Sequence, residues 1–172
     1  FRSACYDGQY FFDTDHPVGM PGKQASVSNF QGGSGDAWFL MDTTKVIKPL
    51  IFQKRRDYAF VSKTSLTDDN VFNQNKFIWG ADGRCNVGFG LWQLAHASKN
   101  ALDKQAYADM RASMQSLKGD NGKPLNVRPT ELWVPPNLEQ AALEVVTAER
   151  LANGATNVMR NTAKVVVCPW LA

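Results

Sequence analysis

The order of apolar and polar residues predicts short β-strands over the first half of the chain. The clearest pattern lies in residues 77–97. Within it, residues 77–79 form an apolar run and residues 87–94 alternate with period 2. Asp82 and Gly83, which lie between these two segments, are typical of a tight hairpin turn. We therefore expect a β-hairpin over residues 77–97, against which the other elements pack.

Three more apolar segments precede this hairpin. Residues 38–41 (WFLM) predict a short buried strand, and residues 46–53 and 58–63 predict two others. Pro49 places the strand at residues 46–53 at a sheet edge or a bulge, because proline cannot donate a ladder hydrogen bond. Basic residues gather here, and a solvated rim is favoured over contact with nucleic acid or an acidic neighbouring subunit. They are Lys45, Lys48, Lys54, Arg55 and Arg56.

Residues 18–36 differ in composition from the strands around them. They include five glycines, three serines and one proline, and they show no apolar periodicity. Such a composition is typical of a linker that stays outside the core. We expect a flexible excursion here that becomes ordered only against a neighbouring subunit.

The second half of the chain has the period of helices. Asp103 is a suitable N-cap, and Tyr107, Met110, Met114 and Leu117 recur at spacings of three and four residues, as core-facing residues of a helix do.

A second helix is predicted to begin at Pro135 and Pro136 and to end before Asn153. It lies between two apolar segments, residues 132–134 and 164–168, each of which predicts a buried strand. This order of strand, helix and strand predicts a parallel β-α-β unit.

Together these elements predict an α+β fold with two lobes. Residues 1–98 are expected to form a β-rich, antiparallel lobe that carries the glycine-rich excursion, with its sheet built from residues 38–97. Residues 99–172 are expected to form a small α/β lobe, in which residues 165–167 and 132–134 lie together. With 172 residues, 44% of them hydrophobic and 20% charged, the chain has enough apolar surface to build a core.

Composition narrows the classes of function. A net charge of +3 is too small by itself to indicate nucleic-acid binding, and no apolar run approaches the ~20 residues of a membrane span. Cys5, Cys85 and Cys168 lie far apart, which favours reduced thiols in an intracellular setting over a disulfide framework. The chain has no signal-peptide layout and opens on Phe1 rather than methionine, so we interpret it as a piece of a longer chain.

Candidate chemical groups are few. Asp13, Asp15 and His16 lie close together, but turn formation ahead of Pro17 is favoured over metal binding, because no second histidine or cysteine lies at ligand spacing. His96 follows an apolar strand and is interpreted as a satisfied structural histidine. The sequence contains neither a phosphate-binding glycine motif nor a nucleophile elbow. We therefore expect no catalytic residue, no cofactor and no metal.

Several long strings resemble one known family. They are CYDGQYFFDTDHPV, WFLMDTTKVIKPLIFQKRR, DDNVFNQNKFIWGADGRCNVGFGLWQLA, LNVRPTELWVPPNLEQAA and VVVCPWLA. In this order they resemble the major head (capsid) proteins of bacteriophage Mu and its prophage relatives, over about residues 5–172. The resemblance implies the tailed-phage capsid fold of the Hong Kong 97 type, with residues 1–98 as a peripheral-type lobe and residues 99–172 as an axial-type lobe. The family's N-terminal arm and long spine helix are missing from this sequence.

The resemblance implies a structural function. The subunit would tile an icosahedral shell around double-stranded DNA, in the virion capsid, after assembly in the cytoplasm of a bacterial host. Its partners would be copies of itself in hexamers and pentamers, scaffold and decoration proteins, and packaged DNA bound non-specifically, but no membrane. The residues present here are expected to be monomeric or weakly associating on their own. Two alternatives stay open: an α/β hydrolase or nucleotide-binding enzyme domain, and the shell protein of a non-viral encapsulating compartment.

The order of the strings also implies a circular permutation of the capsid fold. In simpler members of the fold, a strand like residues 165–172 is followed directly by segments like residues 35–53 and 71–97, which here come earlier. Permutation is tolerated where the termini lie close together at the surface. We therefore expect Ala172 to lie beside the start of the strand at residues 38–41.

Overall fold

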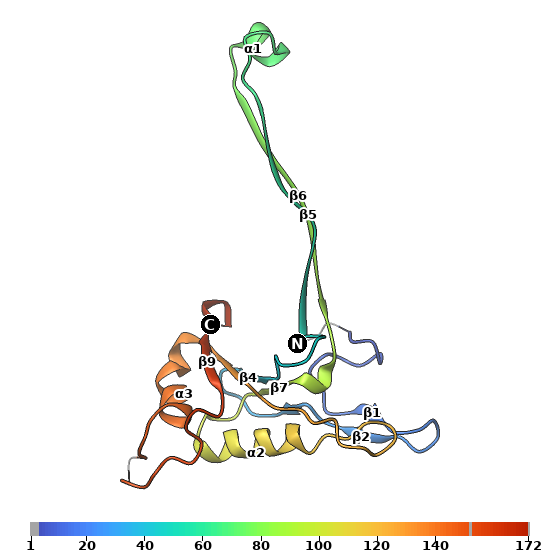
Figure 1. Ribbon diagram of the computed structural model, residues 1–172, viewed down its shortest axis with the longest axis vertical. Coiled ribbons are helices and arrows are strands. Elements are labelled where there is room, and N and C mark those ends of the chain that lie inside the picture. The colour runs from blue at the N-terminus through green and yellow to red at the C-terminus, as the bar shows by residue number, and fades with distance from the viewer. Residues whose placement is uncertain (1–3, 152, 172) are drawn as a thin grey trace. The chain divides into compact units, whose positions relative to one another are not determined.

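The computed structural model describes residues 4–151 and 153–171 and divides the chain into two compact units (Figure 1). The first, here called the sheet unit, comprises Phe1–Pro49 and Phe89–Ala172. The second, here called the ribbon unit, comprises Leu50–Gly88.

A five-stranded sheet forms the centre of the sheet unit. Its strands lie in the order β3-β7-β4-β8-β9. The central strand β4 is antiparallel to both of its neighbours, whereas the outer pairs β3–β7 and β8–β9 are parallel. The bounds are β3 Phe30–Gln31, β4 Trp38–Met41, β7 Ala95–Ser98, β8 Glu131–Val134 and β9 Lys164–Val167.

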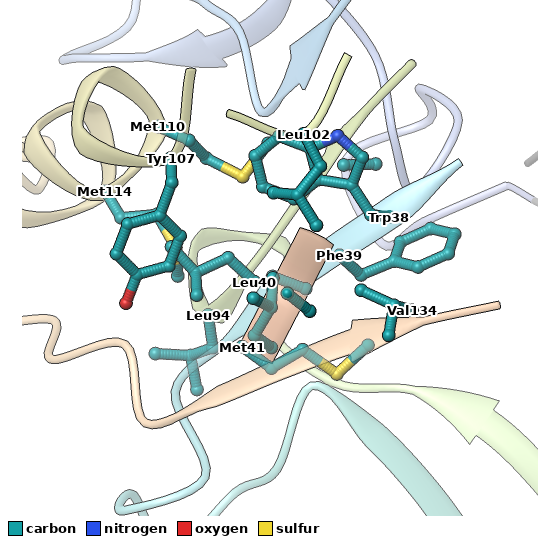
Figure 2. Packing of buried hydrophobic residues seen from close by; sticks show 14 of the residues in the cluster. Trp38, Phe39, Leu40, Met41, Leu94, Leu102, Tyr107, Met110, Met114 and Val134 are labelled. Atoms are coloured by element: carbon teal, nitrogen blue, oxygen red, sulfur yellow. The ribbon is translucent and has the colours of Figure 1, made fainter. Parts of the chain in front are cut away.

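The predicted helix after Asp103 is confirmed as α2, Lys104–Gln115. The Asp103 carboxylate accepts a hydrogen bond from the Ala106 N–H at 2.7 Å and so satisfies one of the free donors at the helix start. The predicted stripe of Tyr107, Met110 and Met114 is fully buried and packs near Trp38 and Leu40 of β4 (Figure 2). Helical periodicity therefore located both the helix and its buried face.

The predicted β-α-β unit is also confirmed, because β8 and β9 pair in parallel with helix α3, Glu139–Val146, between them. A 3-10 turn η2, Pro136–Leu138, leads into α3, and η3, Pro169–Leu171, follows β9. The helix ends earlier than the sequence indicates. The amide of Asn157 donates to the carbonyl oxygens of Val145 and Ala148, which satisfies acceptors at the helix end.

The expected excursion at residues 18–36 is only partly outside the core: residues 20–26 and 32–36 are exposed, but residues 27–31 are partly or fully buried. It contains β2, Ala25–Val27, which pairs with β1, His16–Val18, and it also contains β3. Asn29 between β2 and β3 is only 1% exposed, and its amide donates to the carbonyl oxygens of Phe11 and Ala95. Because a polar side chain, that of Asn29, holds this segment against the core, the segment has no apolar periodicity that would predict the contact.

The glycines of this segment also have a packing role. A Cβ built on Gly33, which has a φ of +105°, would lie 2.4 Å from the Lys99 carbonyl carbon. The backbone of this segment therefore approaches the end of β7 too closely for any side chain. Whether residues 18–36 are mobile in solution stays a prediction.

The ribbon unit consists of two long strands and a short helix. Strand β5, Leu50–Lys63, pairs with β6, Ile78–Phe89, and helix α1, Asp69–Gln74, lies at the end of the ribbon where the chain turns (Figure 1). The predicted strands at residues 46–53 and 58–63 are therefore one continuous element. After β6, the 3-10 turn η1, Trp92–Leu94, leads into β7.

The predicted hairpin turn at Asp82 and Gly83 is wrong, because β6 passes straight through both residues. Gly83 is not among the described glycines with positive φ, which such a turn would require. Its lack of a side chain has another cause: a Cβ at Gly83 would lie 2.5 Å from the ring of Tyr58. The glycine makes room for an aromatic ring on the paired strand.

The predicted division into lobes at residues 98 and 99 is corrected by the sheet. Strand β4 belongs to the segment expected to build a separate sheet, but it pairs with β8 on one side and with β7 on the other. The expected pairing of β8 with β9 is confirmed. The circular permutation stays a prediction, because Ala172, whose position was to test it, lies outside the described residues.

Candidate assembly surface

The ribbon unit exposes large apolar side chains along its length. All 14 residues of β5 are exposed, as are all but one residue of β6. An isolated two-stranded ribbon is marginally stable in water, because it has no second layer to bury its side chains. Exposed apolar surface of this kind is typical of an interaction site.

Four aromatic side chains share one face of the ribbon half that leads to α1. The close approach of Gly83 to Tyr58 places these two residues on one face, and the contact between Gly80 and Val61 places that pair on the other. Because side chains alternate between the faces of a strand, Phe60 and Trp79 lie on the face of Tyr58. The Phe77 ring lies 6.3 Å from the Trp79 ring, between centroids.

This set, here called the aromatic face, consists of Tyr58, Phe60, Phe77 and Trp79, which are 76%, 76%, 49% and 60% exposed. A buried aromatic residue removes 150–250 Å² from water. Four such residues on one face form a large exposed apolar surface, and aromatic residues are enriched in the cores of protein interfaces. The geometry suits burial against another protein surface.

The basic residues near the start of β5 make local contacts. Lys54 pairs with Asp57 at 2.6 Å and Arg56 pairs with Asp82 at 2.5 Å, all on exposed side chains. Lys45 donates to the Asn126 carbonyl, and Lys48 donates to the Thr43 carbonyl. Exposed pairs of this type contribute little to stability, and the choice between a solvated rim and a partner contact for these basic residues stays a prediction.

The candidate metal ligands are not brought together. The Asp13 carboxylate accepts hydrogen bonds from the backbone N–H groups of Thr14 and Tyr10, as a turn-forming aspartate does. His16 pairs instead with Asp7, at 2.7 Å between Nδ1 and Oδ2. In residues 4–151 and 153–171, no three metal-ligating side chains lie close enough to hold an ion. The absence of a metal stays a prediction.

His16 is buried in a complete set of contacts. Its Nε2 lies 3.2 Å from Oδ1 of Asn29, and its ring stacks on Trp92 at 4.0 Å between centroids. The Asn29 oxygen also accepts from the Asp13 N–H, which identifies it as the acceptor end of the amide. Both nitrogens of His16 therefore face acceptors, and the ring joins the first loop to the core.

His96 lies buried on β7, but its side chain lacks a full set of hydrogen-bond partners. This corrects its interpretation from sequence as a satisfied structural histidine. It is 2% exposed, and its Nε2 has no hydrogen-bond partner among the described residues. Burial, followed by the charge of His16, lowers the pKa of His96 to about 3. His96 therefore stays neutral at physiological pH.

The cysteines are free among the described residues, as expected. Cys85 is exposed on β6, and burial raises the pKa of the Cys5 thiol, which disfavours its reactive thiolate form. In the described part of the chain, no helix is long and apolar enough to cross a membrane.

Solved structures similar to this chain include phage capsid proteins. A chain of the procapsid of bacteriophage JBD30 is 42% identical, with a TM-score of 0.85, and the match covers 98% of this chain and 58% of that one. A chain of the JBD30 capsid has a TM-score of 0.88 at 25% identity, with the same coverage. The expected capsid fold is confirmed.

The family described as Mu-like prophage major head subunit gpT matches residues 1–171, and the chain belongs to this family. It is 40% identical over 183 residues to the Mu-like prophage FluMu major head subunit of Haemophilus influenzae, and 39% identical over 181 residues to the major capsid protein of Escherichia phage Mu. Each match covers 99% of this chain and 59% of the relative. The chain thus spans about three fifths of the length of these proteins.

Sequence reasoning named none of the four aromatics as functional. It assigned residues 77–79 to a short apolar strand of the central hairpin, because an apolar run predicts a strand without indicating what covers it. One signal was present: charged residues, Lys54 to Asp57, interrupt the apolar pattern of β5, as they do in a strand exposed to water.

Proposed function

We propose that this chain is the part of a major head subunit that joins its neighbours in a phage shell through the aromatic face of the ribbon unit. The observation that carries the proposal is the exposure of four aromatic side chains on one face of a two-stranded ribbon. Family membership supports the structural class, because the matched family is one of head subunits rather than enzymes. The enzyme alternative has no such support.

The proposal extends to the partners and the place of the assembled protein. The subunit associates with copies of itself in hexamers and pentamers, and the shell encloses double-stranded DNA in the virion after assembly in the host cytoplasm. Contact with DNA is electrostatic and independent of sequence. One solved structure similar to this chain, at 26% identity and a TM-score of 0.80, is described as a JBD30 capsid decorated with minor capsid protein trimers. Decoration and scaffold proteins are therefore proposed partners here as well.

The test uses the complete gene product that contains these residues. Tyr58→Ser and Phe60→Ser are combined to remove half of the aromatic face, and particles are counted by negative-stain electron microscopy. Both side chains are exposed, so the melting temperature of the subunit should change little. We expect folded subunits that form few or no shells.

The matched control is Val61→Ser, which changes an apolar side chain of 58% exposure on the opposite face of the same strand. This variant should assemble as the unchanged protein does. Normal shells from the double variant would refute the role of the aromatic face, and a complete gene product that forms no shells would refute the proposed function itself.

A further inference from the structure

The two histidines of the sheet unit are both buried but differ in their contacts. His16 is 0% exposed and has a partner at each ring nitrogen, whereas His96 is 2% exposed and its Nε2 has no partner among the described residues. Burial, followed by the charge of His16, lowers the pKa of His96 to about 3, so His96 is neutral at physiological pH. The contacts of His16 indicate the opposite charge state.

Asn29 presents an oxygen to the first of the two ring nitrogens. Its Oδ1 lies 3.2 Å from Nε2 of His16 and also accepts the Asp13 N–H at 2.8 Å. Its Nδ2 donates to the carbonyl oxygens of Phe11 at 2.7 Å and Ala95 at 3.1 Å. Turning the amide over would place its NH₂ group against the Asp13 N–H and its oxygen against two carbonyl oxygens. The Asn29 oxygen can only accept, so Nε2 of His16 carries a proton.

The second ring nitrogen faces a carboxylate. Nδ1 of His16 lies 2.7 Å from Oδ2 of Asp7, and the other Asp7 oxygen accepts the Gln9 N–H at 3.2 Å. An imidazole is ordinarily a much stronger base than a carboxylate, so the proton between these two groups lies on Nδ1. With a proton on each nitrogen, the His16 ring is an imidazolium.

The surroundings of the ring offset the cost of burying this charge. Burial disfavours a charged imidazole, and a buried charge is tolerated when it is paired and hydrogen-bonded. The Asp7 carboxylate supplies the opposite charge, and the Trp92 ring stacks on the His16 ring with 4.0 Å between centroids and 8° between planes. The face of an aromatic ring attracts a cation. The contacts therefore fit the charged form of His16.

Four other titratable groups lie near this contact. The Asp13 carboxylate accepts two backbone N–H groups of its own loop. Burial raises the pKa of the Cys5 thiol and of the Tyr6 hydroxyl, so both are neutral at physiological pH, as is His96 of β7. In the described part of the chain, none of these four side chains bonds to His16.

We propose that Asp7 and Asn29 hold His16 in its charged form, and that this contact attaches residues 5–15, here called the first loop, to the sheet unit in a pH-dependent way. His16 begins β1, Asn29 joins β2 to β3, and Trp92 begins η1, so the ring connects the first loop to the sheet from several sides. Loss of either proton would leave a buried nitrogen lone pair facing an oxygen acceptor, which is costly. The first loop is therefore attached while His16 keeps both protons and is released as the pH rises past the point at which one is lost. This device is independent of the aromatic face.

Nitrogen-15 NMR of the complete gene product, unassembled and labelled at histidine, tests the charge state. The His16 signals are identified by through-space contacts with the Trp92 ring, and the His96 signals by their loss in His96→Gln. At neutral pH both ring nitrogens of His16 should carry a proton, whereas one nitrogen of His96 should not. An unprotonated ring nitrogen on His16 at neutral pH would overturn the proposal.

Hydrogen exchange tests the attachment of the first loop. Asp7→Asn removes the carboxylate charge and should make the amide protons of the first loop exchange about tenfold faster at neutral pH, as expected when a charge-assisted hydrogen bond is lost. Asp15→Asn is the matched control, because this exposed aspartate precedes His16 directly but forms no bond with it among the described residues. The control should leave exchange unchanged.

The unchanged protein gives a second readout that requires no variant to fold. After correction for the intrinsic pH dependence of exchange, protection of the first loop should fall over the pH range in which NMR shows His16 losing a proton. Protection that does not follow the titration of His16, or equal exchange in Asp7→Asn and Asp15→Asn, would overturn the proposal. Neither result bears on assembly through the aromatic face, so the proposed function is tested separately.

Discussion

Strands β4 and β5 have similar apolar segments but opposite environments. All four residues of β4 are buried, whereas all 14 of β5 are exposed. Strand β4 has a strand on each side and helix α2 packed against it, while β5 has β6 alone. The comparison teaches that an apolar pattern predicts a strand but does not indicate whether the same chain provides its cover.

The largest expected effect on stability comes from a change in the buried strand β4. Trp38→Ala removes a side chain of 0% exposure whose indole N–H donates to the Asn100 carbonyl at 2.9 Å. It should lower the free energy of unfolding by about 3 to 5 kcal/mol, through lost burial and the cavity that remains. Urea unfolding followed by tryptophan fluorescence and circular dichroism measures this loss. A change below about 1 kcal/mol would show that β4 is not the centre of the core.

A somewhat smaller effect is expected from the polar anchor of the sheet unit. Asn29→Ala leaves the buried carbonyl oxygens of Phe11 and Ala95 without their donor and removes the acceptor of His16. The loss should be about 3 kcal/mol, because buried polar groups without partners are costly. Asn86→Ala on the exposed ribbon is the matched control and should change stability by less than about 0.5 kcal/mol. Equal effects of the two changes would contradict the assigned role of Asn29.

The pH dependence of stability tests the buried sheet unit a third time, through His96 on β7. The pKa of His96 is about 3 in the folded chain and near 6.5 when unfolded, so the unfolded state binds a proton that the folded state does not. The contribution of His96 is therefore flat above about pH 6.5, and stability falls as the pH is lowered from 6.5 toward 3, by at most about 1.4 kcal/mol per pH unit. Unfolding curves at several pH values should show this slope, and His96→Gln should reduce it. An unchanged slope in the variant would exclude His96 as its source.

The smallest effect on stability is expected from the ribbon. Trp79→Ala removes a side chain that is 60% exposed, so the unfolding free energy of the 172-residue chain should change by less than about 0.5 kcal/mol. The measurement is again urea unfolding, made beside Trp38→Ala under identical conditions. A loss as large as that of Trp38→Ala would mean that the ribbon is buried within the single chain, and the contrast with β4 would disappear.

The sequence was most informative where one face of an element is covered by its own chain. Asp103 and the stripe from Tyr107 to Met114 predicted α2 and its buried face, because the helical period and the cap are both local signals. The parallel pair β8–β9 followed from the order of strand, helix and strand.

The errors came from residues whose role depends on distant partners. Asp82 and Gly83 have the local signature of a turn, but the ring of Tyr58 on the paired strand determines the need for glycine. Asn29 is anchored by carbonyl oxygens 18 and 66 residues away, so no local periodicity reveals it. The candidate site shares this property, because the described residues leave the aromatic face exposed and no local pattern indicates what covers it.

The charged segment of β5 has a consequence for the subunit before it assembles. A long exposed strand with free edges is a template for pairing with other unfolded or unassembled chains, which leads to fibrous aggregates. Lys54, Arg55, Arg56 and Asp57 place charges in the middle of β5, between the apolar residues at its start and those that follow. Charged side chains in the middle of an exposed strand disfavour its pairing with a second strand edge, so we expect these residues to act as gatekeepers. We expect them to limit edge-to-edge pairing of free chains while the aromatic face stays exposed.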